Sequence, residues 1–301
     1  MPDDGLTTLK KFDVIFLGAV GAPCTFRYTI PGTQSRFCNY EPGELDWIIL
    51  RENSEGEYAG HGGRSHSNQS YEVATEVSIF NRHGVERIIR FALEIARGRP
   101  KKHLTVLTKS NAQRNGMVMR DSIAADVAKD FPGVEVDKML LTYVISTDWP
   151  PGDVVVDAMT VRMTLKPESL DAIVAPIWQR IPYADILSHL AAALARSLGI
   201  APTNNLDPTR DNPSMLWVLL KFLFFFQARS KRFEARFTFW TACGMLARLG
   251  EKEAADNLED IVEGVCEKGI MTQDLGGSAT TIEVADAVCE AIEVKLGKAS
   301  T

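Results

Sequence analysis

The chain has 301 residues, a formal net charge of −6 at pH 7, 45% apolar residues and 24% charged residues. This composition is typical of a globular protein, and the length allows one large or two ordinary domains. The acidic balance argues against a nucleic-acid partner, and the longest apolar run, residues 216–226, is too short to span a membrane and contains Lys221.

The cysteines indicate a reducing compartment. They lie at positions 24, 38, 243, 266 and 289, without a CxxC pair or a cysteine–histidine spacing typical of a metal site. The N-terminus begins Met-Pro-Asp-Asp-Gly and lacks the apolar segment of a signal or transit peptide. We therefore expect a cytoplasmic protein.

Strand and helix patterns alternate along most of the chain. Strands are predicted at residues 12–21, 45–50, 103–107, 153–156 and 170–175. Helices are predicted at residues 85–96, 121–131, 186–198, 251–267 and 282–293. Residues 22–44 show little periodicity and are predicted to form a loop. This alternation favours an α/β fold with a mostly parallel sheet.

Two stretches fit no predicted element. Residues 141–155 contain a Pro-Pro-Gly turn and precede Asp157. Residues 216–237 are first strongly apolar and then strongly basic, with no turn signal and no clear helical period. If it were exposed, the second stretch would favour aggregation.

The segment RENSEGEYAGHGG (residues 51–63) follows the predicted strand at 45–50 and places Arg51 and Tyr58 beside a glycine-rich turn. Arginine can bind a carboxylate through two parallel hydrogen bonds. Tyrosine can donate a proton where its surroundings lower its pKa. The pattern fits a site for an anionic substrate beside a proton donor, and it also fits a charged strand end with a polar loop.

Lys109 follows the predicted strand at 103–107, and Asn111 lies two residues further on. A lysine at such a place can serve as a general base if burial or a nearby cation lowers its pKa. A surface lysine after a strand gives the same pattern. Lys109 is thus a candidate base, and Asn111 is a candidate polar contact beside it.

Asp157 ends a valine run, Asp185 opens a predicted helix, and His189 lies one turn later on the same helical face. Carboxylates at such places can hold a divalent cation. Asp185 also fits a carboxylate that satisfies free amides at a helix N-terminus, and His189 fits a packed histidine. The chain has no GxGxxG after a strand and no GxxxxGK[ST], so the sequence assigns no cofactor-binding residues.

Together these segments resemble the β-decarboxylating dehydrogenases of 2-hydroxy acids, the isocitrate/isopropylmalate dehydrogenase family, and within it the tartrate/D-malate branch. The motifs that carry the resemblance occur in the family's order. They are RENSEGEYAGHGG (51–63), GVERI (84–88), TKSN (108–111), VDAM (156–159), DILS (185–188), GIAP (199–202), NLDP (205–208), NPSM (212–215) and DLGG (274–277).

The resemblance implies a role for four of the candidate residues. Arg51 binds a substrate carboxylate, and Lys109 takes the hydroxyl proton as hydride leaves for the nicotinamide of NAD. Tyr58 protonates the enolate that remains after CO₂ is lost. Asn111 lies beside the nicotinamide and the substrate.

The resemblance also implies a Mg²⁺ or Mn²⁺ ion held by Asp157 and Asp185, with His189 at the position of the family's third metal carboxylate. Such an ion chelates the substrate and stabilises the enolate. Imidazole suits Zn²⁺ or Mn²⁺ better than Mg²⁺. Members of the family are homodimers, so we expect Lys109 and Asp157 to reach into the cleft of a second copy.

The expected architecture is an isopropylmalate-dehydrogenase-like two-domain fold with a mostly parallel sheet and an incomplete large domain. Residues 1–40 and 200–301 would form the large, cofactor-side domain. Residues 41–199 would form the small domain, which carries the substrate and metal residues and makes the dimer.

The chain also departs from the family. The opening strand-helix-strand region and an arginine-bearing segment before Arg51 are not found. Residues 141–155 read as an insertion, and residues 216–237 stand where the family binds the adenosine half of NAD. The resemblance implies NAD-dependent, metal-assisted oxidation, with or without decarboxylation, of a small 2-hydroxy acid such as tartrate or D-malate. The departures keep open an alternative, namely a catalytically inactive relative or partner subunit that has lost the cofactor loop.

Overall fold

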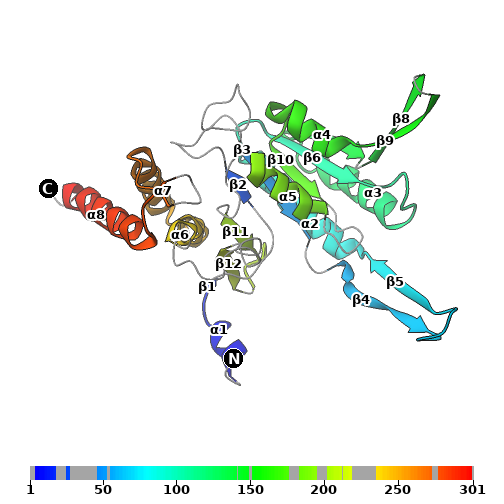
Figure 1. Cartoon of the computed structure of the whole chain (residues 1–301), viewed down its shortest axis with the longest axis horizontal. Helices are drawn as coiled ribbons and strands as arrows, with labels where there is room; N and C mark the ends of the chain where they lie inside the picture. Colours follow the sequence, from blue (N-terminus) through cyan, green and yellow to red (C-terminus); the bar gives the residue numbers. More distant parts are fainter. Residues whose placement is uncertain are drawn as a thin grey trace. The chain divides into compact units, whose positions relative to one another are not determined.

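The chain divides into two compact units. In a computed structural model, the described residues are 4–17, 25–27, 46–52, 55–140, 142–148, 151–175, 183–194, 202–211, 213–218, 235–272 and 277–299. Unit 1 comprises Met1–Asp46 and Ala191–Thr301, and unit 2 comprises Trp47–Leu190 (Figure 1). Unit 2 is therefore one continuous stretch of chain inserted between the two segments of unit 1.

A parallel sheet forms the centre of unit 2. Its strands lie in the order β3 (Asp46–Arg51), β10 (Ala172–Ala175), β6 (His103–Thr108) and β7 (Glu135–Leu140), and each neighbouring pair is parallel. Nearly every residue of β6 and β10 is buried, which is typical of strands covered on both faces. The prediction of an α/β fold with a mostly parallel sheet is confirmed, as are the three predicted strands that correspond to β3, β6 and β10.

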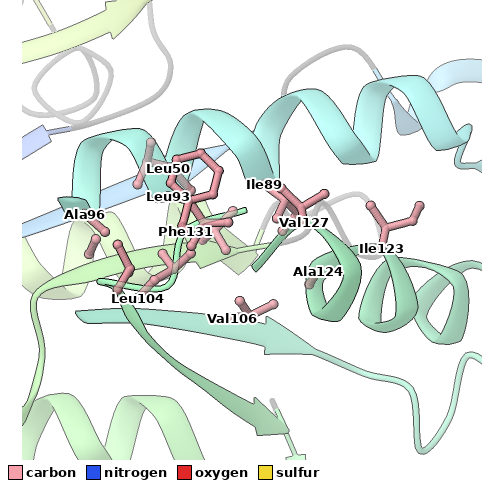
Figure 2. Packing of buried hydrophobic residues seen from close by; sticks show 14 of the residues in the cluster. Leu50, Ile89, Leu93, Ala96, Leu104, Val106, Ile123, Ala124, Val127 and Phe131 are labelled. Carbon is pink, nitrogen blue, oxygen red and sulfur yellow. The ribbon is translucent and has the colours of Figure 1, made fainter. Parts of the chain in front are cut away.

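Helices α2 (Arg82–Arg97) and α3 (Gly116–Ala128) pack on this sheet. Figure 2 shows Ile89 and Leu93 of α2 beside Val127 of α3 in a shared core that also includes Leu104 of β6. Burying each large apolar side chain there contributes about 1.5–3 kcal/mol. The predicted helix at 85–96 is confirmed.

The helix predicted at 121–131 was placed too late, because α3 already begins at Gly116 and ends at Ala128. Its buried face includes Met117 and Arg120 ahead of Ile123 and Val127. The positive charge of Arg120 interrupts the apolar pattern, so the periodicity of apolar residues does not indicate the first turn of the helix.

Two antiparallel ribbons extend from unit 2 (Figure 1). One pairs β4 (Gly56–Ser65) with β5 (Val73–Ile79), and the other pairs β8 (Thr142–Asp148) with β9 (Pro151–Asp157). The second ribbon contains most of the unassigned stretch 141–155 and confirms the strand predicted at 153–156.

The glycine-rich turn predicted within residues 51–63 is wrong, because these glycines lie in β4 and the chain turns at residues 66–71. Gly62 is required for a different reason. A Cβ at that position would lie 2.3 Å from the carbonyl oxygen of Thr75 on β5. The glycine therefore allows close approach of two backbones.

Three further elements complete unit 2 and reach the unit boundary. They are α4 (Ala158–Leu165), the 3₁₀ helix η1 (Pro167–Ser169) and α5 (Tyr183–Leu194). The helix predicted at 186–198 is confirmed over the part that the structure describes.

Among its described residues, unit 1 contains a small sheet and three long helices. Strand β12 (Ser214–Val218) lies between β1 (Val14–Leu17), to which it is parallel, and β11 (Pro202–Asn205), to which it is antiparallel. Two short elements are α1 (Gly5–Leu9) and β2 (Thr25–Arg27). The strand β2 lies within the predicted loop at 22–44, most of which is outside the described residues.

The helices of unit 1 are α6 (Ala235–Leu249), α7 (Lys252–Glu267) and α8 (Thr281–Ala299). Trp240, Val262 and Val288 bring them together in one core cluster. The helices predicted at 251–267 and 282–293 are confirmed. The strand predicted at 12–21 is confirmed over Val14–Leu17, and residues 18–21 lie outside the described part of the chain. Within the described residues, no helix has both the length and the hydropathy that a membrane crossing requires.

Candidate active site

The carboxyl ends of the parallel strands in unit 2 bring two predicted site residues to one edge. Strand β3 ends at Arg51, which pairs with Ala175 at the end of β10, and β6 ends one residue before Lys109. One strand, β10, separates β3 from β6, so their ends lie about 10 Å apart at the usual strand spacing. Open α/β sheets usually bind ligands outside this edge.

A tight turn holds the backbone of Lys109. The carbonyl oxygen of Lys109 accepts hydrogen bonds from the N–H groups of Ala112 and Gln113, both at 2.9 Å. The N–H of Ser110 donates to Oγ1 of the buried Thr108 at 3.3 Å. The Lys109 side chain is only 8% exposed, whereas Asn111 in the same turn is exposed. The backbone of the candidate base Lys109 is therefore held in a defined position, as proton transfer from one substrate atom requires.

Arg120 lies at the same carboxyl edge of the sheet, and the sequence did not predict it as a site residue. Its side chain is 3% exposed, and its guanidinium donates to the carbonyl of Leu107 on β6 and, at 3.3 Å, to the carbonyl of Val174 on β10. Burial lowers the pKa of Arg120 to about 10, against the opposing effect of the Asp121 carboxylate, so the group stays charged at neutral pH. The spacing of Met117, Arg120 and Ile123 is the signal that could have found it.

The segment between β3 and β4 is tied to helix α2. Both carboxylate oxygens of Glu52 accept from Arg87 at 3.0 Å, and Glu55 accepts from the N–H of Asn81 at 3.2 Å. Glu55 is 7% exposed, and this burial raises its pKa. A Cβ on Gly84 would lie 2.2 Å from Oε1 of Glu55, so a larger residue at position 84 would displace this carboxylate.

Tyr58 follows this anchored segment as the third residue of β4, and its side chain lies outside the described part of the structure. The adjoining Ala59 lines a cavity of about 210 Å³. The other lining residues are Glu55, Ile79, Asn81, His83, Gly84 and Arg87. The role of Tyr58 stays a prediction.

The predicted metal residues lie on two elements of unit 2. Asp157 is the last residue of β9, and Asp185 and His189 are four residues apart in α5, where that spacing places them on one face. Their side chains are outside the described part of the structure. Among the side chains that are described, no group of three or more His, Cys, Asp or Glu residues is placed to hold a metal ion. The metal site therefore stays a prediction.

Comparison with known proteins adds independent information. Residues 2–215 match the family described as isocitrate/isopropylmalate dehydrogenase. A probable tartrate dehydrogenase/decarboxylase of Agrobacterium vitis is 52% identical over 97% of this chain and 83% of its own length. The decarboxylating D-malate dehydrogenase of Escherichia coli K12 is 32% identical over 97% of this chain and 84% of its own length.

A solved structure supports the fold. The isocitrate dehydrogenase from Methylococcus capsulatus superposes with a TM-score of 0.78 at 24% identity, over 97% of this chain and 85% of that one. At this identity the likeness speaks for the fold alone, and it agrees with the α/β class.

Proposed function

The chain belongs to the tartrate/D-malate branch of the isocitrate/isopropylmalate dehydrogenase family, and we propose that it oxidises and decarboxylates a small 2-hydroxy acid, such as tartrate or D-malate, with NAD and a divalent metal. The observation that carries the proposal is the shared carboxyl edge of Arg51 and Lys109. In a homodimer in which Lys109 serves the other copy, the Arg51 of one copy and the Lys109 of the other would supply a cation for the substrate and a base for its proton, which supports hydroxy-acid chemistry.

Four of the proposed residues would each have a distinct task in this reaction. Arg51, half-buried at the end of β3, binds a substrate carboxylate through its guanidinium. Lys109 accepts the proton of the substrate hydroxyl during oxidation. Asn111, exposed in the turn that follows, helps orient the substrate. After CO₂ is lost, Tyr58 delivers a proton to the enolate carbon.

The donor set proposed for the metal consists of Asp157, Asp185 and His189. Two carboxylates and one imidazole form a set that suits Mn²⁺ and Mg²⁺ sites, with the imidazole favouring Mn²⁺. When bound, the ion acts as a Lewis acid on the substrate oxygens. The cofactor is proposed as NAD from the branch, and no residue is assigned to it.

We further propose that residues 41–199 act as the small domain that carries the site and forms a homodimer. Residues 1–40 and 200–301 would act as the cofactor-side domain. In support, all seven proposed residues fall in the continuous stretch of unit 2, Trp47–Leu190. In such a dimer, Lys109 and Asp157 would serve the cleft of the other copy.

The direct test is an assay of the purified full chain with NAD, Mn²⁺ and either D-malate or tartrate. We expect NADH and CO₂ to form in equal amounts, with the Lys109→Ala variant as the control. A rate no higher than that of Lys109→Ala would overturn the proposed activity and would favour the inactive relative instead.

A further inference from the structure

The buried guanidinium of Arg120 is held by the main chain. Its hydrogen-bond acceptors are two main-chain carbonyls, those of Leu107 and Val174. Asp121 stabilises the charge electrostatically, but its carboxylate forms an ion pair with Lys138 at 3.3 Å. No carboxylate within the described residues therefore serves as a hydrogen-bond acceptor for Arg120.

This arrangement is costly. Transfer of a cation from water to a protein interior costs several kcal/mol, and an ion pair or strong hydrogen bonds must offset it. An apolar side chain at position 120 would continue the stripe formed by Met117, Ile123 and Val127 without that cost. The charge therefore needs a reason beyond the packing of α3 on the sheet.

The two acceptors supply that reason. Leu107 lies on β6 and Val174 on β10, each one residue before its strand ends. The guanidinium thus bridges the ends of two neighbouring strands. Leu107 is two residues before Lys109, and the carbonyl oxygen of Lys109 accepts the hydrogen bonds of the turn that follows β6. A planar group with several fixed donors suits such a bridge.

We propose that Arg120 is a positioning residue for Lys109, because it ties the end of β6 to β10 and so fixes the point from which the lysine projects. This inference rests on the role given to Lys109 in the proposed function. Arg120 acts through the backbone of residues 107–109 and is not itself assigned a contact with the substrate. A small displacement of a reacting group can lower the rate about 100-fold.

The variants Arg120→Met and Arg120→Lys test the proposal. Methionine is apolar and lacks the donors, whereas lysine keeps the charge and can donate to a carbonyl. Arg99→Met is the matched control, because Arg99 is also a buried arginine of unit 2 but pairs with Asp171 at the amino ends of the strands.

For the steady-state assay with NAD, Mn²⁺ and D-malate or tartrate, we expect Arg120→Met to lower kcat by about 30- to 100-fold. KM should change less than about threefold, because Arg51 on β3 is untouched. Arg120→Lys should recover part of kcat. Arg99→Met should lower the melting temperature and leave kcat unchanged.

Amide hydrogen exchange gives a second readout that needs no turnover. The N–H groups of Ala112 and Gln113 should exchange at least about tenfold faster in Arg120→Met, and not in Arg99→Met. If Arg120→Met matches Arg99→Met in both kcat and exchange, the proposal is overturned. If the wild type shows no turnover, the proposed function fails, and the exchange comparison alone decides this inference. If Arg120→Met is insoluble, Arg120→Lys carries both comparisons.

Discussion

The two edges of the parallel sheet in unit 2 hold their buried charged groups with different partners. At the amino edge, the buried Asp171 accepts from Arg99 and from the N–H of His103. At the carboxyl edge, the buried Arg120 is held by main-chain carbonyls, and Arg51 and Lys109 lie at the same edge. One edge thus pairs its buried cation with a carboxylate, whereas the other holds its buried cation on main-chain carbonyls and carries Arg51 and Lys109.

This difference indicates that the amino edge of the sheet mainly serves stability and that the carboxyl edge mainly serves the chemistry. Removing one partner of a buried ion pair is strongly destabilising, because it leaves the other charge buried without compensation. An edge rich in cations attracts an anionic substrate and supplies charge-assisted hydrogen bonds to it. Changes at the amino edge should therefore affect unfolding, and changes at the carboxyl edge should affect turnover.

The largest effect is expected at the carboxyl edge. Lys109→Met removes the proposed base and should lower kcat by about 10²- to 10⁴-fold, because general-base catalysis contributes that much. The melting temperature should stay within a few degrees of the wild-type value. Steady-state NADH formation and thermal unfolding measure the two quantities. A loss of stability without a loss of kcat would reverse the assignment of the edges.

The amino edge is tested by Asp171→Asn. The substitution leaves the charge of Arg99 buried without its carboxylate, which should lower the free energy of unfolding by about 3 kcal/mol. Urea unfolding measures it, and kcat should not change. The double variant Arg99→Met/Asp171→Asn is the control, since removing both charges should restore part of the stability. A large drop in kcat at a temperature where the variant is folded would contradict the comparison.

A neutral hydrogen bond at the amino edge should matter less. Nε1 of the buried Trp47 donates to the carbonyl of Pro167 at 3.0 Å. Trp47→Phe removes this bond and should cost about 1 kcal/mol, measured as a shift of the urea midpoint. Both kcat and KM should be unchanged. Any selective change in KM would show that this edge also contributes to the substrate site.

The smallest effect concerns Glu55, which follows β3 on the carboxyl side. Burial raises its pKa above the ordinary value of 4.5 in the folded state, so the folded state binds this proton more tightly than the unfolded state. The contribution of Glu55 to stability is thus most favourable at low pH and declines as pH rises through the folded pKa. The change in the free energy of unfolding caused by Glu55→Gln should therefore be more favourable at pH 7 than at pH 4.

Urea unfolding at the two pH values measures this difference. The exposed Glu94 of α2 provides the matched control, Glu94→Gln. If Glu55→Gln loses more stability at pH 7 than at pH 4, then the charged carboxylate is favourable where it lies, and the sign argued from burial is wrong.

The elements predicted correctly are those whose signals are local. Strand β6 is a continuous apolar run, and α2 repeats its apolar residues at helical spacing, so a short window is enough. The β4–β5 ribbon depends instead on a partner strand. The glycines of β4 suggested a turn, but Gly62 is there so that Thr75 of β5 can approach.

The features of the candidate site also divide into those with a local sequence signal and those that depend on distant parts of the chain. Arg51 and Lys109 were each recognisable as polar residues at a strand end. That they share an edge depends on β10, which lies between β3 and β6 although it follows both in sequence. Arg120 could not be found from polarity alone, because a charge in an apolar stripe marks a functional position only when its acceptors are known.

The insertion of unit 2 within unit 1 has a consequence for synthesis on the ribosome. Val14 of β1 pairs with Ser214 of β12, so the whole of Trp47–Leu190 leaves the exit tunnel before that pairing can form. The nascent chain can complete the inserted unit first, while the apolar strand Val14–Leu17 lacks β12. An unpaired strand edge is a site of aggregation, so chaperone demand should be greatest during this interval.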